Sequence, residues 1–403
     1  MAAIKYWLWL SSQTRLSPRA RAAVAKHYGG AEEAFHAPAG DFGRVPGVNR
    51  LEAQLLEKRD MSRVEPILEA CHIQGIDIIT MQDADYPARL RNIFAPPVVL
   101  YVKGSLKDLD EEAAVAVIGT RKASVYGLKM GRNLAWEIAK AGGTVVSLVT
   151  GGIDEAAAKG ALLGGGRCIA VLGTPHRERE SSLCLDIAHS GALVSEYPPG
   201  THVLKSFFRD RNRIASGLSL GVAVVEAPEN SGALLFAAEA LEQGREIFAV
   251  PGNADAPNSA GTIELIKQGA KPVTCGWDVL EEFAPLYPEK LKEKGPVSAP
   301  VPGPQQPEKA AVPQASRPEE SKKEIDKKKS KGYIDLREQL SGLSTEQLEI
   351  VKAVSGGSQH IDDIIEATGY TAAKVLSQLT LLEIKGYIRR DAGKRISLNL
   401  IRK

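Results

Sequence analysis

The densest group of side chains that could do chemistry lies in the segment FFRDRNRIASGLS, residues 207–219. Together with Lys205 just before it, the segment holds two phenylalanines, three arginines within five residues and an asparagine: Lys205, Phe207, Phe208, Arg209, Arg211, Asn212 and Arg213. In an extended segment alternate residues share a face, so we expect the three arginines to line one rim. Arginines for phosphates beside aromatic rings for base stacking are typical of single-stranded nucleic-acid sites.

A structural alternative exists for the same segment. Its phenylalanines would belong to the core, and its arginines would pair with carboxylates such as Glu196 or Glu226. We favour the core interpretation for the phenylalanines. For the arginines we favour a binding role, because three such charges in five residues are hard to neutralise all at once.

Three loops that follow apolar segments could also hold an anion. VIGTRKASVYG runs from a strand through Gly119 and Arg121 into a helix start, where backbone N–H groups point outward and an arginine adds bidentate donors. The alternative is that this glycine only makes a tight turn. SEYPPG contributes Ser195, and APENSGALL contributes Ser231 and Gly232. If the strands are parallel, these loops meet at one edge of the sheet.

No motif in the sequence predicts catalysis. GxGxxG, the Walker motif GxxxxGK[ST] and HExxH are all absent from the sequence, and its seven histidines are dispersed. The four cysteines have no CxxC spacing, which argues against a zinc site or a disulfide framework and favours a reducing cytoplasm. Asp154 and Glu155 are most simply first-turn helix carboxylates. We therefore expect no catalytic residue, no cofactor and no metal, and a binding groove instead.

The elements that would position these loops are strands alternating with helices. From residue 76 to 287, apolar β-branched runs such as VAVIG, TVVSLV and GVAVVEA are separated by amphipathic segments, which predicts a doubly wound α/β sheet. Residues 1–75 show helical spacing and predict a small helical domain. Residues 334–403 predict helices followed by a hairpin that turns at Asp391, Ala392 and Gly393.

A change in composition separates the last two folded regions. Residues 288–332 hold 8 of the 23 prolines, with 11 basic and 7 acidic residues and no aromatic residue. Such a segment cannot bury enough apolar surface to offset its ordering entropy, so we expect a disordered linker over 288–333. Its KKKSK run could touch nucleic acid, but a solvated linker is the simpler interpretation.

The whole-chain charge points to a local site. The 403 residues carry 51 Lys and Arg against 49 Asp and Glu, a formal net charge of +2, so a polyanion site must be a local patch. No apolar stretch approaches the roughly 18–20 residues that span a bilayer, and the N-terminal IKYWLWL is too short for a signal sequence. We expect a cytoplasmic protein with no membrane contact.

Seven segments of the central region resemble, in order and spacing, the DNA-processing protein A family (DprA, also called Smf): VIGTRKASVYG, GGIDEAAAKGAL, CIAVLG, ALVSEYPPG, FFRDRNRIASGLS, VVEAPENSGALL and FAVPG…SAGTIELIKQGA. The resemblance implies an extended Rossmann-like fold that binds single-stranded DNA, loads the RecA recombinase in natural transformation and forms a homodimer through this domain. The two ends are similar to the family's N-terminal helical (SAM-like or helix-hairpin-helix-like) domain and its C-terminal winged helix. Nine residues stand where the family pattern places them: Gly119, Arg121, Ser195, Phe207, Arg211, Asn212, Arg213, Ser231 and Gly232.

The chain departs from that pattern at three positions. Gly151 stands in place of an expected arginine, Ala158 in place of a histidine and Phe236 in place of a threonine. The missing arginine removes one cationic contact from the strand-end loops.

The C-terminal segment IDDIIEATGYTAAKVLSQLTLLEIKGYIRR follows winged-helix order, with a helix at 361–367 and a second from Thr371 to about Lys385. Only Lys374 and Gln378 could read bases from the second helix, whereas Arg389, Arg390, Lys394 and Arg395 cluster in the wing. Weak sequence reading, or a protein contact, is therefore expected of this unit.

The sequence thus favours a protein that binds single-stranded DNA and is not an enzyme. The alternative is a nucleotide-processing enzyme of the phosphoribohydrolase type on a related Rossmann-like fold, which ENSGALLFAAEA faintly resembles through Glu239.

Overall fold

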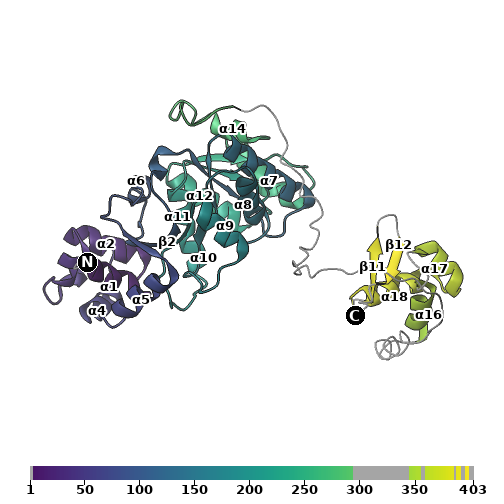
Figure 1. Cartoon of the computed structure of the whole chain (residues 1–403), viewed down its shortest axis with the longest axis horizontal. Helices are drawn as coiled ribbons and strands as arrows, with labels where there is room; N and C mark the ends of the chain where they lie inside the picture. Colours follow the sequence, from purple (N-terminus) through teal and green to yellow (C-terminus); the bar gives the residue numbers. More distant parts are fainter. Residues whose placement is uncertain (1–2, 294–344, 355–358, 385–386, 392–394, 399–403) are drawn as a thin grey trace, which may run out of the picture. The chain divides into compact units, whose positions relative to one another are not determined.

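The computed structural model describes residues 3–293, 345–354, 359–384, 387–391 and 395–398 (Figure 1). The chain divides into two compact units, Met1–Gln306 and Pro307–Lys403. From residue 294 onward, the linker expected at 288–333 lies outside the described residues. Within its first six residues Leu291 packs on the α/β region at 5% exposed, and the Lys292 N–H donates to the Ala141 carbonyl at 3.0 Å.

The first unit begins with short helices, as the spacing predicts. They are α1 (Ile4–Ser12), α2 (Pro18–Tyr28), α3 (Ala31–Phe35), the 3₁₀ turn η1 (Asp41–Arg44), α4 (Arg50–Glu57) and α5 (Val64–Gln74). Asn49 and Glu52 form a capping box at the start of α4, and Ser17 caps α2. Glu52 also accepts hydrogen bonds from the Ser17 N–H and Oγ at 2.9 and 2.8 Å, which ties the two helix starts together.

A nine-stranded sheet forms the centre of this unit, in the order β1-β2-β6-β5-β4-β3-β7-β8-β9. Its strands are β1 (Asp77–Thr80), β2 (Val99–Gly104), β3 (Ala114–Ile118), β4 (Thr144–Ser147), β5 (Cys168–Leu172), β6 (Ala192–Ser195), β7 (Gly221–Val224), β8 (Glu246–Ala249) and β9 (Lys271–Pro272). Neighbouring strands are parallel throughout the stretch β6-β5-β4-β3-β7-β8-β9. At the other edge β2 runs antiparallel to both β6 and β1. The predicted doubly wound Rossmann-like sheet is confirmed, with an antiparallel extension at one edge.

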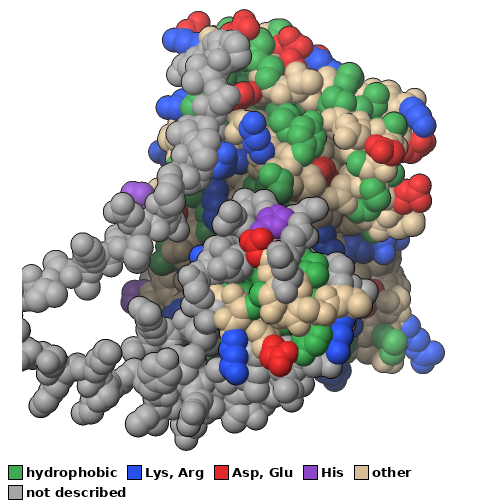
Figure 2. All heavy atoms as spheres, turned by 90° about the vertical axis from the view of Figure 1, so that its right-hand side faces the viewer, with side chains coloured by type: hydrophobic (Ala, Val, Ile, Leu, Met, Phe, Trp, Pro, Cys, Tyr) green, Lys and Arg blue, Asp and Glu red, His purple; other side chains and the backbone are tan. Residues whose placement is uncertain are grey.

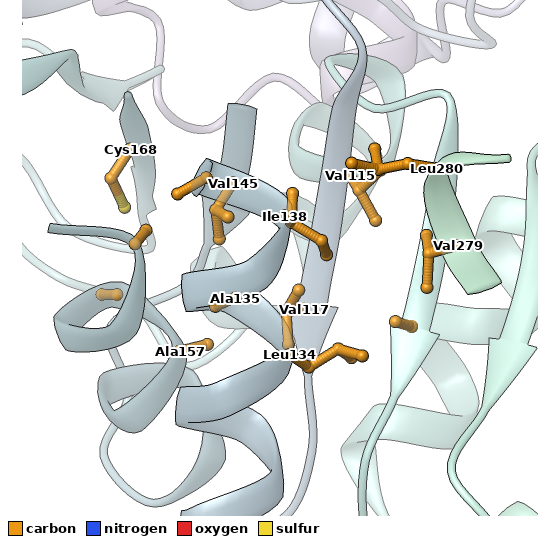
Figure 3. Packing of buried hydrophobic residues seen from close by; sticks show 14 of the residues in the cluster. Val115, Val117, Leu134, Ala135, Ile138, Val145, Ala157, Cys168, Val279 and Leu280 are labelled. Carbon is orange, nitrogen blue, oxygen red and sulfur yellow. The ribbon is translucent and has the colours of Figure 1, made fainter. Parts of the chain in front are cut away.

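Helices cover both faces of the sheet (Figure 1). One face is packed by α7 (Val125–Lys140), α8 (Ile153–Leu163), α9 (Ser182–Ser190) and α14 (Gly276–Leu280). The other is packed by α6 (Ala88–Arg91), α11 (Asn212–Gly217), α12 (Gly232–Glu242) and α13 (Ala260–Lys267). Successive residues of β3 point to opposite faces, and Figure 3 shows Val115 and Val117 meeting Leu134 and Ile138 of α7. Both faces being apolar explains why the strands read as continuous hydrophobic runs.

Three short elements complete the first unit: η2 (Leu109–Glu111), α10 (Phe207–Asp210) and η3 (Pro257–Ser259). The helical region packs on the antiparallel edge, where Trp7 and Trp9 of α1 share a buried cluster with Val99 and Tyr101 of β2. The helical region and the sheet therefore share a core.

The second unit has the predicted winged-helix order. It contains α16 (Thr345–Val354), β10 (Gln359–His360), α17 (Ile361–Thr368), α18 (Ala372–Ile384), β11 (Ile388–Asp391) and β12 (Arg395–Leu398), with an antiparallel sheet β10-β12-β11. Gly369, at the turn between α17 and α18, has φ 65°, a left-handed conformation that glycine adopts without strain. Residues such as Ile350, Leu379 and Ile396 form its own small core.

Charges of both signs are interspersed on the face drawn in Figure 2, in keeping with the balanced composition. In the part of the chain that the structure describes, no helix is both long and apolar enough to cross a bilayer.

Candidate nucleic-acid interface

A pocket of about 480 Å³ opens at the carboxyl ends of the parallel strands, where the loops after β3, β4 and β5 meet. Its wall contains the ring of Phe208 and four cations: Arg121, Lys159, Arg177 and Arg211. Lys159 is paired with Glu155 at 2.7 Å. Arg121 and Arg177 are exposed, and their side chains make no ion pair or hydrogen bond with any described residue. The pocket therefore presents uncompensated positive charge at the edge where α/β sheets bind ligands.

Arg211 is the buried cation of this pocket. It is 6% exposed, and its Nη1 donates to the carbonyls of Leu148 at 3.1 Å and Val171 at 3.5 Å. Its Nε–H has no partner among the described residues, and its guanidinium carbon lies 5.9 Å from the centre of the Phe208 ring. Burial lowers the pKa of Arg211 to about 10, so the group stays charged at neutral pH. A buried cation without a carboxylate in salt-bridge contact is well suited to an incoming anion.

Asp154 holds the loops beneath the pocket together. Its carboxylate accepts hydrogen bonds from the Gly119 N–H at 3.3 Å and from the Thr150 hydroxyl. Burial raises the pKa of Asp154 to about 6, although the nearby Arg211 charge acts in the opposite direction. Gly152 has φ 60°, and a Cβ there would lie 2.4 Å from the Thr120 carbonyl, so glycine allows this close approach.

The Arg121 loop is fixed on its other side by Glu226, which is 4% exposed. This carboxylate accepts hydrogen bonds from the N–H and Oγ of Ser124 and from Asn258 Nδ2 at 3.2 Å. The Thr120 N–H donates to the Glu226 carbonyl at 2.8 Å. Glu226 is thus satisfied by local groups, and Arg121 does not pair with it.

The expected extended conformation of residues 207–213 is wrong. These residues form α10 and the start of α11, and in a helix residues two apart point in different directions. Arg209 projects into solvent, Arg211 lies in the pocket and Arg213 is buried at 6% exposed. The three arginines therefore do not line one rim.

The two phenylalanines also separate. Phe207 is 3% exposed and stacks on Tyr197 with ring centres 3.6 Å apart, as the core interpretation predicts. Phe208 is 45% exposed and borders the pocket, so for this ring the core interpretation is wrong. A ring that is open on one side can stack on a base.

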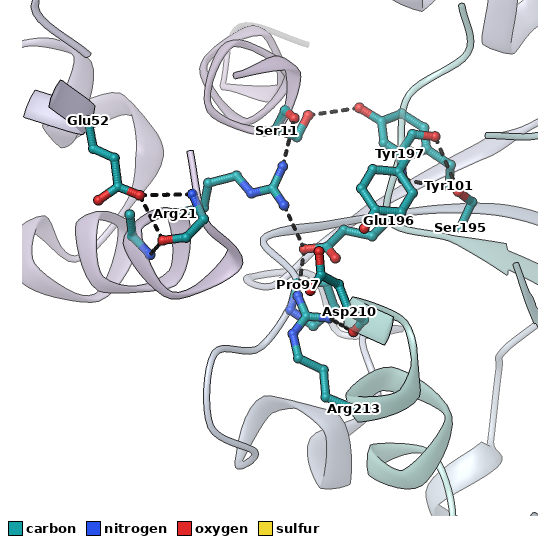
Figure 4. A network of polar contacts seen from close by, with 12 residues as sticks. Ser11, Arg21, Glu52, Pro97, Tyr101, Ser195, Glu196, Tyr197, Asp210 and Arg213 are labelled. Carbon is teal, nitrogen blue, oxygen red and sulfur yellow. Dashed lines mark hydrogen bonds and ion pairs between the residues drawn. The ribbon is translucent and has the colours of Figure 1, made fainter. Parts of the chain in front are cut away.

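Arg213 follows the structural alternative, because it pairs with Glu196 at 2.7 Å. The same Glu196 Oε1 also accepts from Arg21 of α2 at 3.3 Å, and all three side chains are nearly inaccessible to solvent (Figure 4). Arg21 in turn donates to the Ser11 carbonyl, and the Ser11 hydroxyl bonds the Tyr101 hydroxyl at 2.8 Å. This network joins the helical region to the α10–α11 segment that carries Phe208.

Other predicted residues lie near the strand ends without lining the pocket. Ser195 is fully buried, and its Oγ donates to backbone carbonyls, including that of Thr174 at 2.8 Å. Ser231 and Gly232 begin α12, and the Ser231 hydroxyl has no partner among the described residues. Lys205 is exposed just before α10, and Asn212 is buried at the start of α11. The pocket thus brings together Arg121 and Arg211 from the predicted set.

Lys159 and Arg177 were missed from the sequence. The first lies on α8, four residues after Glu155, and the second lies in the HRERE loop after β5. The available signal was only that α8 and the Arg177 loop each follow a parallel strand, β4 and β5.

The three departures from the family pattern have different structural settings. Ala158 and Phe236 are buried in the two core layers, at 0% and 1% exposed. Gly151 has φ 90°, and a Cβ there would meet no atom within 4 Å, so the space beside it is open. Lys159 and Arg177 supply other cations to the same pocket.

A doubly wound parallel sheet with a cationic pocket at its strand ends defines a Rossmann-like domain built for an anionic ligand. The chain belongs to the DNA recombination-mediator protein A family, whose model matches residues 77–284. A second model, the DprA winged helix domain, matches residues 336–394. The resemblance read from the seven segments is confirmed.

Individual relatives match between about half and nearly all of the chain. DNA processing protein DprA of Bacillus subtilis (strain 168) is 40% identical over 221 residues, which cover 54% of this chain and 74% of that protein. Protein Smf of Synechocystis sp. is 30% identical over 403 residues and 97% of both chains. The X-ray structure of DNA processing protein A from Streptococcus pneumoniae is 32% identical, covers 69% of this chain and 97% of that one, and has a TM-score of 0.60.

Proposed function

We propose that this protein binds single-stranded DNA in the strand-end pocket and hands it to the RecA recombinase during DNA uptake, without catalysing a reaction. The observation that carries the proposal is the pocket itself, in which a buried Arg211 with an unpaired Nε–H lies beside the unpaired Arg121 and the half-exposed Phe208 ring. One phosphate would lie between the two arginines, and the neighbouring base would stack on the phenylalanine.

The preference for single strands follows from the ring. A base in a duplex is already stacked on both sides, whereas a base in a single strand is free to lie against Phe208. Lys205 and Arg209 are both exposed, and both are close to Phe208 in the sequence. They would contact the phosphates of the DNA strand where it leaves the pocket.

Family membership supports a role with a recombinase, since the family model is described as a DNA recombination-mediator protein. An apolar groove supports a homodimer through the central domain. It has a volume of about 630 Å³, lies beside the edge strand β9 and is lined by Leu241, Ile247 and Leu265, with Leu241 66% exposed.

Several described residues support a role without catalysis. Burial raises the pKa of the Cys71 and Cys168 thiols to about 12, so neither is a reactive thiolate at neutral pH. Glu239, the carboxylate on which the phosphoribohydrolase alternative depends, borders a different pocket from the one at the strand ends. The described residues contain no cluster of His, Cys, Asp and Glu suited to a metal ion.

Fluorescence anisotropy with labelled oligothymidine tests the proposal. Phe208→Ala should weaken binding by about 5- to 100-fold, the loss of one stacked base. Lys140→Gln is the matched control, because Lys140 lies over the Trp136 ring on α7 and not in the pocket. Equal affinity of Phe208→Ala and the natural chain would contradict the proposal, and release of free base from a panel of nucleotides would favour the enzyme.

A further inference from the structure

A second pocket rich in cations lies where the helical region meets the α/β region. It has a volume of about 710 Å³ and is bordered by α2, by the loop before α4 and by the connection from β1 to β2. Arg19, Lys26 and Arg91 line it together with Trp7 and Phe94, and its lining contains no Asp or Glu. It shares no lining residue with the strand-end pocket.

Phe94 is the unusual residue of this pocket, because its ring is 73% exposed. The loop that carries it is held in place rather than frayed. Ala95 has φ 54°, a left-handed conformation that is strained for alanine, and the buried Tyr86 donates a hydrogen bond to the Pro97 carbonyl at 2.8 Å. A large ring presented to solvent by a fixed and strained loop indicates a contact with another molecule.

The cations around the ring make no direct ion pair with a described carboxylate, although Glu52 lies close enough to Arg19 to interact with its charge. Arg19 places its guanidinium carbon 5.8 Å from the centre of the Phe94 ring and makes no ion pair with a described residue. Lys26 is exposed in the last turn of α2, also without an ion pair to the described chain. Arg91 donates to the carbonyls of Met81, Asp83 and Tyr86, so its charge is held at the pocket by backbone groups and not by a carboxylate.

We infer that this pocket is a second contact for single-stranded nucleic acid, with a base stacked on Phe94 and the adjacent phosphates against Arg19 and Lys26. The inference rests on the proposed function and extends it to the helical region. Phe94 also borders a smaller pocket, in which Glu239 and Glu242 are balanced by Arg89 and Arg245. The pocket beside α2 has three cations and no carboxylate in its lining, so phosphates are more favourable on that side of the ring.

Binding of DNA strands of two different lengths distinguishes this second contact from the strand-end pocket. An oligothymidine of about 6 nucleotides occupies one pocket, given that ~4–16 nucleotides fill a typical single-strand site, whereas one of about 60 can engage both and gain avidity. Phe94→Ala and Arg19→Gln should each lower the affinity for the long oligothymidine by about 5- to 50-fold and leave the affinity for the short one unchanged. Phe94→Tyr should bind as the natural chain does, and Lys140→Gln serves as the control.

A cross-link gives a second, direct measurement. Long strands containing 5-iodouracil should cross-link on irradiation to the peptide that contains Phe94, even when Arg121→Ala has weakened the strand-end pocket. If Phe94→Ala binds both strands normally and no cross-link forms at residue 94, this inference is wrong while the proposed function stands. If the natural chain binds neither strand, both are wrong. Displacement of the long strand by polyglutamate from the natural chain, but not from Phe94→Ala, would assign the pocket to an acidic protein instead.

Discussion

The character of the strand-end pocket depends on how two buried charges are satisfied. Arg211 is held by backbone carbonyls and keeps one N–H unpaired, while Asp154 beneath it is held by Gly119 and Thr150. Neither charge is cancelled by a direct ion pair with the other. Arg211 lines the pocket and Asp154 does not, so the pocket presents the positive one of these two buried charges, and a bound phosphate would offset part of the cost of burying the arginine.

The exposed cations should account for the salt dependence of DNA binding. Replacing Arg121 and Lys205 together with alanine removes two side chains that have no partner in the described part of the chain. The slope of log K against log salt should become shallower by about 1–2, since each phosphate contact on a single strand contributes ~0.7. Titration of oligothymidine binding between low and high salt measures this slope. A folded double variant with an unchanged slope would show that these cations do not touch the phosphates.

Asp154 should make stability depend on pH in an unusual direction. Burial raises its pKa in the folded protein to about 6, so between pH 4 and 6 the folded state binds more protons than the unfolded state. The free energy of unfolding should therefore fall as pH rises through this window, by about 3 kcal/mol from this group. Below pH 4 and above pH 6 its contribution should be flat.

Urea unfolding of the natural chain and of Asp154→Asn at a series of pH values measures this effect. All four tryptophans (Trp7, Trp9, Trp136 and Trp277) lie in the first unit, so their fluorescence reports on that unit alone. Relative to the natural chain, the asparagine variant should gain stability as pH rises from 4 to 7. A constant difference between the two proteins would show that the carboxyl does not titrate in this range.

At the scale of elements, the α10–α11 segment determines which arginines can bind DNA. Arg209 belongs to α10 and is exposed, whereas Arg213 belongs to α11 and is buried, where Glu196 pairs with it and with Arg21. Arg213→Met leaves the buried carboxylate with one partner at 3.3 Å and should cost about 3 kcal/mol of unfolding free energy. Its salt slope for single-stranded DNA should not change, because this guanidinium does not reach the solvent.

Arg209→Met is the matched control from the same segment. Arg209 is exposed, so its replacement should leave stability within about 0.5 kcal/mol and make the salt slope shallower by about 0.7. Urea unfolding and the salt titration measure both effects in the two variants. The opposite pattern, with a stable Arg213→Met that has a shallower slope, would place Arg213 on the DNA.

Strands β3, β4, β5, β6 and β7 were predictable because each is buried on both faces and therefore reads as an uninterrupted apolar run, as in VAVIG. The burial of Arg213 was not predictable, because the residues of its ion-pair network, Arg21 and Glu196, are distant in the sequence. In addition, the local alternation of arginine with polar residues resembles the period of a β-strand. Arg121 was predictable as the first charge after a strand. Arg177 was not, because nothing in its own loop indicates that it faces the pocket.

At the scale of the molecule, the two units differ in what they offer to DNA. In the winged helix, Lys374 lies over the Tyr370 ring at 4.5 Å and Gln378 accepts a hydrogen bond from Gln347, so both side chains predicted to read bases are engaged within the unit. The wing contributes Arg389, which is exposed, while the side chains of Arg390, Lys394 and Arg395 lie outside the described part. We therefore propose that the first unit, and not the winged helix, provides the single-strand contacts.

Competition between single-stranded and duplex DNA tests this assignment most directly. Labelled oligothymidine bound to the full chain at about physiological salt is challenged with unlabelled single strand or duplex at equal nucleotide concentration. We expect the single strand to displace the label at a concentration at least about 10-fold lower than the duplex, and Phe208→Ala to remove most of this preference. If the duplex displaces the label as readily as the single strand does, the central claim is wrong and the DNA site belongs to the winged helix.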